Sequence, residues 1–270
     1  FRSSILFQTY RFDCDRFLSF HITPEGKARA EQNPYSTHRV FRRRLIGVAE
    51  QRWNQACYQK VLDASPSGTI AYTREPAVDE LLGLAPFSNL EKVLDYLRSE
   101  EPPKFIIKPA ITAPTDLVEG LETTYETYKL KPETISFDLL WIQPHKDNTY
   151  SVSIIDIRLA ETPSLAHRME LTYQMLALQR ILEANGLTDR YSVSDIGYIW
   201  PGTHERDRFP SLFKEYQSTE NPIAEAFKKM LVHVQTETYK RKVVELLTRR
   251  LPSVLETGFK NAQWNLDGAC

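Results

Sequence analysis

The chain is 270 residues long with 41% hydrophobic and 26% charged residues, a length and composition that allow one large domain or two small ones. The formal net charge of −1 excludes a globally basic nucleic-acid binder, so any nucleic-acid contact needs a local basic patch. No apolar run reaches the length of a membrane span and no signal peptide opens the sequence. We therefore expect a cytoplasmic protein without a membrane partner, and we expect the segment from Phe1 to Cys270 to be part of a longer chain.

The first half of the sequence is predicted to be mainly helical. Apolar residues at helical spacing predict one long helix over residues 38–64, whose first half carries four arginines. Shorter helical patterns follow at 78–84 and 89–99, and residues 105–107 have an extended pattern.

The pattern changes to strands after residue 135. Residues 135–142 and 151–159 are rich in β-branched and apolar residues and flank a polar turn with Asp147 and Asn148 at its tip, which predicts a hairpin. Residues 165–184 then predict a helix that ends before Gly186, where a helix-ending glycine is expected. A third strand is expected over 191–200, and the remainder from residue 209 is expected to be mainly helical.

This order predicts an α/β fold with a central mixed sheet flanked by helices. We expect a single domain over residues 1–270, with a core at about 38–202 and a helical C-terminal part at about 206–262.

The predicted hairpin holds a candidate metal site. If the turn is centred on Asp147, Asp138 lies directly opposite Asp156, and directly opposed residues have Cβ atoms roughly 4.5–5.5 Å apart. Two buried, facing carboxylates repel each other, and a divalent cation such as Mg²⁺ removes that cost. Arg158 then projects beside the metal, where it can hold a phosphate. The alternative is a solvated sheet face with a cross-strand ion pair.

Five segments in this order resemble the RecB-like PD-(D/E)XK nucleases, a group that includes CRISPR adaptation exonucleases and AddB-type helicase-nucleases. The segments are CDRFL at 14–18, LIGVAEQ at 45–51, FDLL at 137–140, IIDIR at 154–158 and HRMELTYQ at 167–174. The resemblance implies a restriction-endonuclease-like core that hydrolyses phosphodiester bonds in DNA with Mg²⁺ or Mn²⁺. It assigns catalytic roles to Asp138, Asp156, Arg158 and Glu170, and metal ligation to Asp138, Asp156 and Glu50.

The departures from the family pattern lie at the chemical positions. Arg158 replaces the family's lysine, and arginine does not give up its proton at neutral pH. Glu170 stands at the helix glutamine, Gln51 at the helix histidine, and Tyr173 is displaced by one residue from the family's tyrosine. These departures leave a second hypothesis open, namely a catalytically inactive nuclease-like module that binds nucleic acid or scaffolds a larger DNA-processing assembly. A third is an unrelated α/β domain that carries these acids by chance.

The resemblance also implies cofactors and partners. Iron–sulfur members of the family place one cysteine near the start and three near the end of the core, so Cys14 and Cys270 are candidate ligands of a [4Fe–4S] cluster completed beyond residue 270. The alternative is that both are ordinary cysteines. The partners implied are DNA and a helicase or other DNA-processing subunit. Candidate phosphate contacts are Arg39, Arg42, Arg43 and Arg44, together with the Lys240–Lys242 and Arg249–Arg250 clusters; the alternative is a solvated helix face.

Overall fold

The structure is a computed structural model that describes residues 6–8, 14–32, 36–66, 68–72, 88–202 and 208–262. For residues 30, 31, 36–46 and 146 it describes the backbone alone. The helix predicted at 78–84 lies outside the described residues. Among the described helices, none is both long and apolar enough to cross a membrane.

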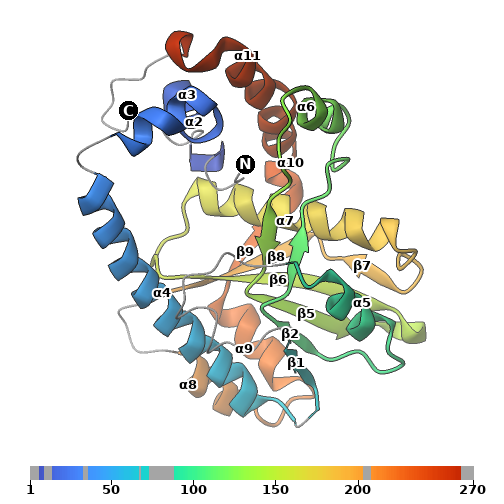
Figure 1. Ribbon diagram of the computed structural model, residues 1–270. Helices are drawn as coiled ribbons and strands as arrows, with labels where there is room; N and C mark the ends of the chain where they lie inside the picture. The colour runs from blue at the N-terminus through green and yellow to red at the C-terminus, as the bar shows by residue number, and fades with distance from the viewer. Residues whose placement is uncertain are drawn as a thin grey trace.

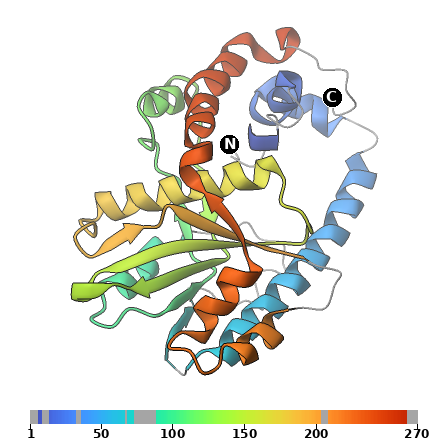
Figure 2. The same cartoon turned by 180° about the vertical axis from the view of Figure 1, so that it is seen from behind.

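The described part is an α/β fold with a mixed sheet flanked by helices on both faces (Figures 1 and 2). The helices are α2 (Asp15–Ile22), α3 (Pro24–Glu31), α4 (Ser36–Ala64), α5 (Leu90–Arg98), α6 (Leu121–Thr127), α7 (Leu165–Ala184), α8 (Phe209–Glu215), α9 (Pro222–Met230), α10 (Thr236–Glu245) and α11 (Leu251–Asn261). The strands are β1 (Ile70–Tyr72), β2 (Phe105–Ile107), β3 (Ala110–Thr112), β4 (Thr134–Ser136), β5 (Leu139–Pro144), β6 (Tyr150–Arg158), β7 (Tyr191–Val193), β8 (Ile196–Pro201) and β9 (Val232–Gln235).

The main sheet has the strand order β1-β2-β5-β6-β8-β9, and β7 pairs with β6. The pairs β2/β5, β5/β6 and β8/β9 are antiparallel, whereas β1/β2, β6/β7 and β6/β8 are parallel. Strand β6 lies centrally and is buried on both faces, which explains its nearly continuous apolar sequence.

Two apolar layers cover the two faces of the sheet. Alternate residues of β6 point to opposite faces, so Val152 and Ile154 belong to one core cluster and Ile155 and Ile157 to the other. The first cluster includes residues of α7, α5 and α10, and the second includes residues of α4, α8 and α9. Figure 2 shows α7 on one side of the sheet, and α8 and α9 on the other.

Most predicted elements within the described residues are confirmed, but the strands differ in several places, and β1 and β3 were not predicted. The chain breaks the strand predicted at 135–142, because Phe137 N–H donates to the carbonyl of Pro109 and the segment Thr134–Ser136 pairs with β3 in a separate two-stranded sheet. The strand predicted at 191–200 is likewise two strands, with a break at Ser194, whose hydroxyl accepts a bond from Ile196 N–H. Strand β9, within the C-terminal part expected to be helical, extends the sheet by pairing with β8.

Turns and helix ends follow their sequence signals. Asp147 and Asn148 have φ angles of 63° and 58° at the hairpin tip, a left-handed conformation that Asp and Asn tolerate better than most residues. Helix α7 begins at Ser164, whose hydroxyl accepts from His167 N–H, and ends before Gly186, which has φ of 65°. The hairpin and α7 therefore position the residues of the candidate site.

Candidate functional site

The candidate site lies where β5 begins and β6 ends, at the end of the hairpin away from its tip. Leu139 pairs with Ile155 and Leu140 with Ile154, so the register places Asp138 at the position opposite Asp156, as predicted from a turn centred on Asp147. Helix α4 contacts β6, and α7 supplies Glu170. The hairpin, α4 and α7 therefore bring together residues more than one hundred positions apart in the sequence.

Asp138 accepts hydrogen bonds from four donors. Its Oδ1 accepts from the Tyr58 hydroxyl at 3.0 Å, from Asn54 Nδ2 at 3.2 Å and from Lys108 Nζ at 3.4 Å. Its Oδ2 accepts from the backbone N–H of Ile157 at 2.8 Å. The break before β5 leaves Asp138 outside the strand ladder, so its carboxylate serves as a connector between α4, the end of β2 and β6.

Asp156 makes a different set of contacts. Asp156 is 4% exposed, and Arg158 Nε donates a hydrogen bond to Asp156 Oδ2 at 2.5 Å. The same guanidinium donates through Nη2 to Glu170 Oε2 at 3.0 Å. Arg158 therefore bridges two carboxylates, one on its own strand and one on α7.

The pKa values follow from burial and from this crowding of charges. Burial raises the pKa of Asp156 to about 7, with the nearby negative charges of Asp138 and Glu170 adding to the rise and Arg158 opposing it. Burial alone lowers the pKa of Arg158, but the carboxylates of Asp156 and Glu170 outweigh it and raise that pKa above the usual value. Asp156 therefore gains and loses its proton near neutral pH, whereas Arg158 stays charged.

Glu50 of α4 belongs to the same group of charged residues as Asp138, Arg158 and Glu170. Its side chain is exposed by surface area, yet desolvation by the surrounding protein raises its pKa, and Asp138 and Glu170 add to that rise while Arg158 opposes it. All five residues predicted for the site are thus within electrostatic reach of one another. We call the four carboxyl residues Glu50, Asp138, Asp156 and Glu170, together with Arg158 and Lys108, the acid–base cluster.

Donors within the protein occupy some of the carboxylate oxygens of the predicted divalent-cation site. Arg158 donates to Asp156 Oδ2, and three donors hold Asp138 Oδ1. Among the described residues there is no group of three His, Cys, Asp or Glu side chains placed to hold a metal ion. The prediction that Asp138, Asp156 and Glu50 bind Mg²⁺ or Mn²⁺ stays a prediction.

Sequence reasoning missed Lys108 of the cluster and two residues that donate hydrogen bonds to Asp138, Asn54 and Tyr58. Asn54 and Tyr58 are four residues apart on α4 and so lie on one face of that helix, a spacing that could have indicated a shared partner. Lys108 has φ of 53°, which is unusual for lysine, and its ammonium also lies 5.4 Å from the centre of the Tyr58 ring. It follows the buried strand β2 as an isolated charge, which is a weak signal in the sequence.

The other predicted site residues lie away from this cluster or outside the described residues. Cys14 is buried at the start of α2, is disulfide-bonded, and its Sγ accepts from Phe17 N–H at 3.3 Å. Cys270 and the side chains of Arg39, Arg42, Arg43 and Arg44 lie outside the described part. Cys57 is buried in the core cluster that includes residues of α4, α8 and α9, and it is not part of a disulfide.

The C-terminal helix returns to the N-terminal end of the described chain. Helix α11 packs against α2, Arg16 Nη1 donates to the carbonyl of Lys260 at 2.9 Å, and Arg250 pairs with Asp15 at 2.8 Å. Cys14 therefore lies close to where the described chain ends. The iron–sulfur centre remains a prediction.

No protein-family model matches the chain, and neither the curated proteins nor the solved structures contain a match. The assignment of function therefore depends on the residues of the chain itself.

Proposed function

We propose that this chain is a nuclease-like domain that binds nucleic acid without hydrolysing it. The observation that carries this proposal is the bridge from Arg158 to both Asp156 and Glu170, in which two carboxylates within the protein hold one guanidinium. The restriction-endonuclease-like core is part of the proposal, supported by the order α4, β5, β6, α7 and β8 that the resemblance leads us to expect.

The chemistry of the bridge argues against hydrolysis. An arginine keeps its proton throughout the neutral range, so Arg158 cannot take a proton from water. Its planar group is also fixed by two carboxylates, both mostly shielded from solvent, with side-chain exposures of 5% for Asp156 and 18% for Glu170. A guanidinium held in this way is better placed to link strand β6 to helix α7 than to move with a phosphate during a reaction.

The test combines a binding and a cleavage assay on the whole 270-residue chain. Fluorescently labelled single- and double-stranded oligonucleotides are titrated with protein at about 50 mM salt, and the same samples are run on denaturing gels with Mg²⁺, Mn²⁺ or chelator. We expect binding that weakens as salt rises, with no cleavage product in any metal condition. A chain that does not bind at low salt would overturn the proposal.

A second candidate function is a metal-dependent deoxyribonuclease, which two observations favour. The pKa of Asp156 is about 7, so the protein alone stabilises the charged form of this carboxyl group poorly. Lys108, the residue after β2, lies 3.4 Å from Asp138 and so supplies a lysine to the cluster. Cleavage that depends on Mg²⁺ or Mn²⁺ and disappears in Asp156→Ala would support this candidate over the first. Arg158→Lys is the matched variant, because it restores the lysine at the position of the family pattern.

A further inference from the structure

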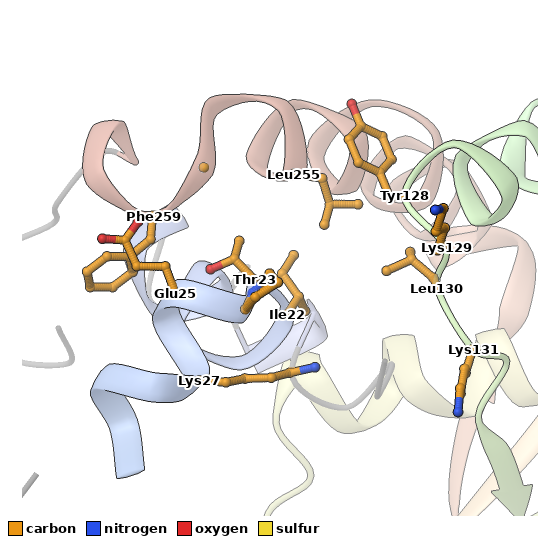
Figure 3. A pocket seen from close by; sticks show the side chains of 12 residues that line it. Ile22, Thr23, Glu25, Lys27, Tyr128, Lys129, Leu130, Lys131, Leu255 and Phe259 are labelled. Carbon is orange, nitrogen blue, oxygen red and sulfur yellow. The ribbon is translucent and has the colours of Figure 1, made fainter. Parts of the chain in front are cut away.

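A groove of about 670 Å³ lies apart from the acid–base cluster, between the N-terminal helices, the segment after α6 and helix α11 (Figure 3). Its volume is in the range of ligand-binding sites in proteins. Apolar side chains at the groove are Ile22 of α2, Leu130 of the segment after α6, and Leu255 and Phe259 of α11. In Figure 3, Leu130 and Leu255 point into the space between the elements. Three parts of the chain that are distant in sequence therefore build one concave surface.

The charged side chains at this groove are mainly basic. Lys27 of α3, and Lys129 and Lys131 after α6, line it and are exposed to solvent. None of these three lysines makes an ion pair with a residue that the structure describes. Glu25 is the acidic lining residue, and its Oε1 lies 4.0 Å from Lys260 Nζ. An anionic ligand thus meets three available cations and one partly neutralised acid.

Lys129 occupies a backbone position that normally favours glycine. The N–H of Leu130 donates to the carbonyl of Tyr125 at 2.9 Å and the N–H of Lys129 to that of Glu126 at 3.3 Å, the bonding pattern of a Schellman helix end. Lys129 takes the left-handed position of this motif, with φ of 51°. The same motif at the end of α7 uses Gly186, with φ of 65°. A lysine in this conformation costs stability, which indicates that its side chain serves a purpose other than folding.

The apolar surface selects among anionic ligands. A single strand of nucleic acid exposes both phosphates and unpaired bases, and such strands bind in grooves that combine basic residues with apolar or aromatic surfaces for the bases. Tyr128, half-buried, also lines the groove and carries an aromatic ring. Base-paired DNA keeps its bases stacked inside and offers this apolar surface no partner.

We propose that the groove lined by Lys27, Lys129 and Lys131 binds single-stranded nucleic acid. The inference rests on the proposed function and adds to it the place on the molecule where the strand lies and the form of nucleic acid that is preferred. The phosphates contact the three lysines, and the bases lie against Leu130, Leu255 and the ring of Tyr128.

The first experiment measures the salt dependence of binding of a labelled oligo(dT) strand to the whole chain. The triple variant Lys27→Gln, Lys129→Gln and Lys131→Gln removes three phosphate contacts, and each contact contributes about 0.7 to the slope of log Kd against log salt for single strands. We therefore expect the slope to fall by about 2, and the affinity at 50 mM salt to fall about 500-fold. The matched control changes three exposed lysines of α5, α8 and α9, Lys92, Lys214 and Lys229, to glutamine, with the same change of net charge and an unchanged slope expected.

A second variant separates binding from folding. Lys129→Gly removes one cation and places glycine at the left-handed position, so it should raise the melting temperature by about 2 °C. The same change should weaken binding of the strand about 8-fold at 50 mM salt and lower the slope by about 0.7. A variant that is more stable and binds less well cannot owe its lost affinity to unfolding.

The outcomes distinguish the inference from the proposed function. If the wild-type chain binds the strand and the triple variant binds with the same slope, the groove inference is wrong while the proposed function stands. A preference for double-stranded over single-stranded DNA of the same sequence would also overturn the groove inference alone. A wild-type chain that binds no nucleic acid at low salt overturns both.

Discussion

Replacing Arg158 by methionine tests whether the guanidinium stabilises the fold through Asp156. Methionine keeps an unbranched apolar stem of similar reach but leaves Asp156, which is 4% exposed, without its charged partner. Removing one partner of a buried ion pair typically costs 3–5 kcal/mol, and Coulomb's law gives about 4 kcal/mol for unit charges 4 Å apart at an effective dielectric constant of 20. Because the Arg158 side chain is 24% exposed, we take the lower end, about 3 kcal/mol, at pH 8.5.

The cost should depend on pH. The pKa of Asp156 is about 7 with Arg158 in place, and loss of the nearby positive charge raises it further, so at pH 5.5 the variant holds a neutral carboxyl group. At pH 5.5 the loss of unfolding free energy is then close to that for a single hydrogen bond, about 1 kcal/mol. Arg158→Met should therefore be destabilised about 2 kcal/mol more at pH 8.5 than at pH 5.5, as measured by urea unfolding at both pH values.

The double variant Asp156→Asn with Arg158→Met supplies the control, because it removes the buried charge together with its partner. At pH 8.5 it should be more stable than Arg158→Met alone, and the double-mutant cycle gives the interaction energy of the pair. Equal destabilisation of Arg158→Met at the two pH values, or a double variant no more stable than the single one, would refute the reasoning.

Three further predictions follow from the same contacts. Tyr58→Phe removes the 3.0 Å hydrogen bond to the carboxylate of Asp138 and should lower the free energy of unfolding by about 1.5–3 kcal/mol in chemical denaturation. Gly202→Ala should destabilise by more than about 2 kcal/mol, because an added Cβ would lie 2.4 Å from the carbonyl oxygen of Leu159; a wild-type melting temperature would contradict this. Burial raises the folded-state pKa of Asp156 to about 7, above its ordinary value of 3.8, so the unfolded chain releases this proton first as pH rises. Its contribution should therefore be complete below about pH 4 and be lost up to about pH 7, at about 1.4 kcal/mol per pH unit, and Asp156→Asn should remove that slope from the pH dependence of unfolding.

The sequence by itself determined most of the framework. Helical spacing identified α4, α5 and α7, and the polar turn at Asp147 fixed the hairpin register, because side chains alternate along a strand and one turn centre sets every pair. That register places Asp138 opposite Asp156. Local rules suffice for these features because their partners are close in the sequence.

The tertiary structure alone decided what the two aspartates contact. The break before β5 depends on the pairing of Thr134–Ser136 with β3, and β9 depends on a place at the edge of the sheet beside β8. The donors to Asp138 come from α4 and from Lys108 at the end of β2, 30 and more residues away. No periodicity in the sequence encodes such contacts, because they arise only when separate elements pack against the same end of the sheet. The position of Glu170 on α7 likewise determines which group Asp156 faces, a cation or the Arg158 guanidinium. The balance of charge in the cluster therefore depends on the packed fold rather than on the D-x-R motif.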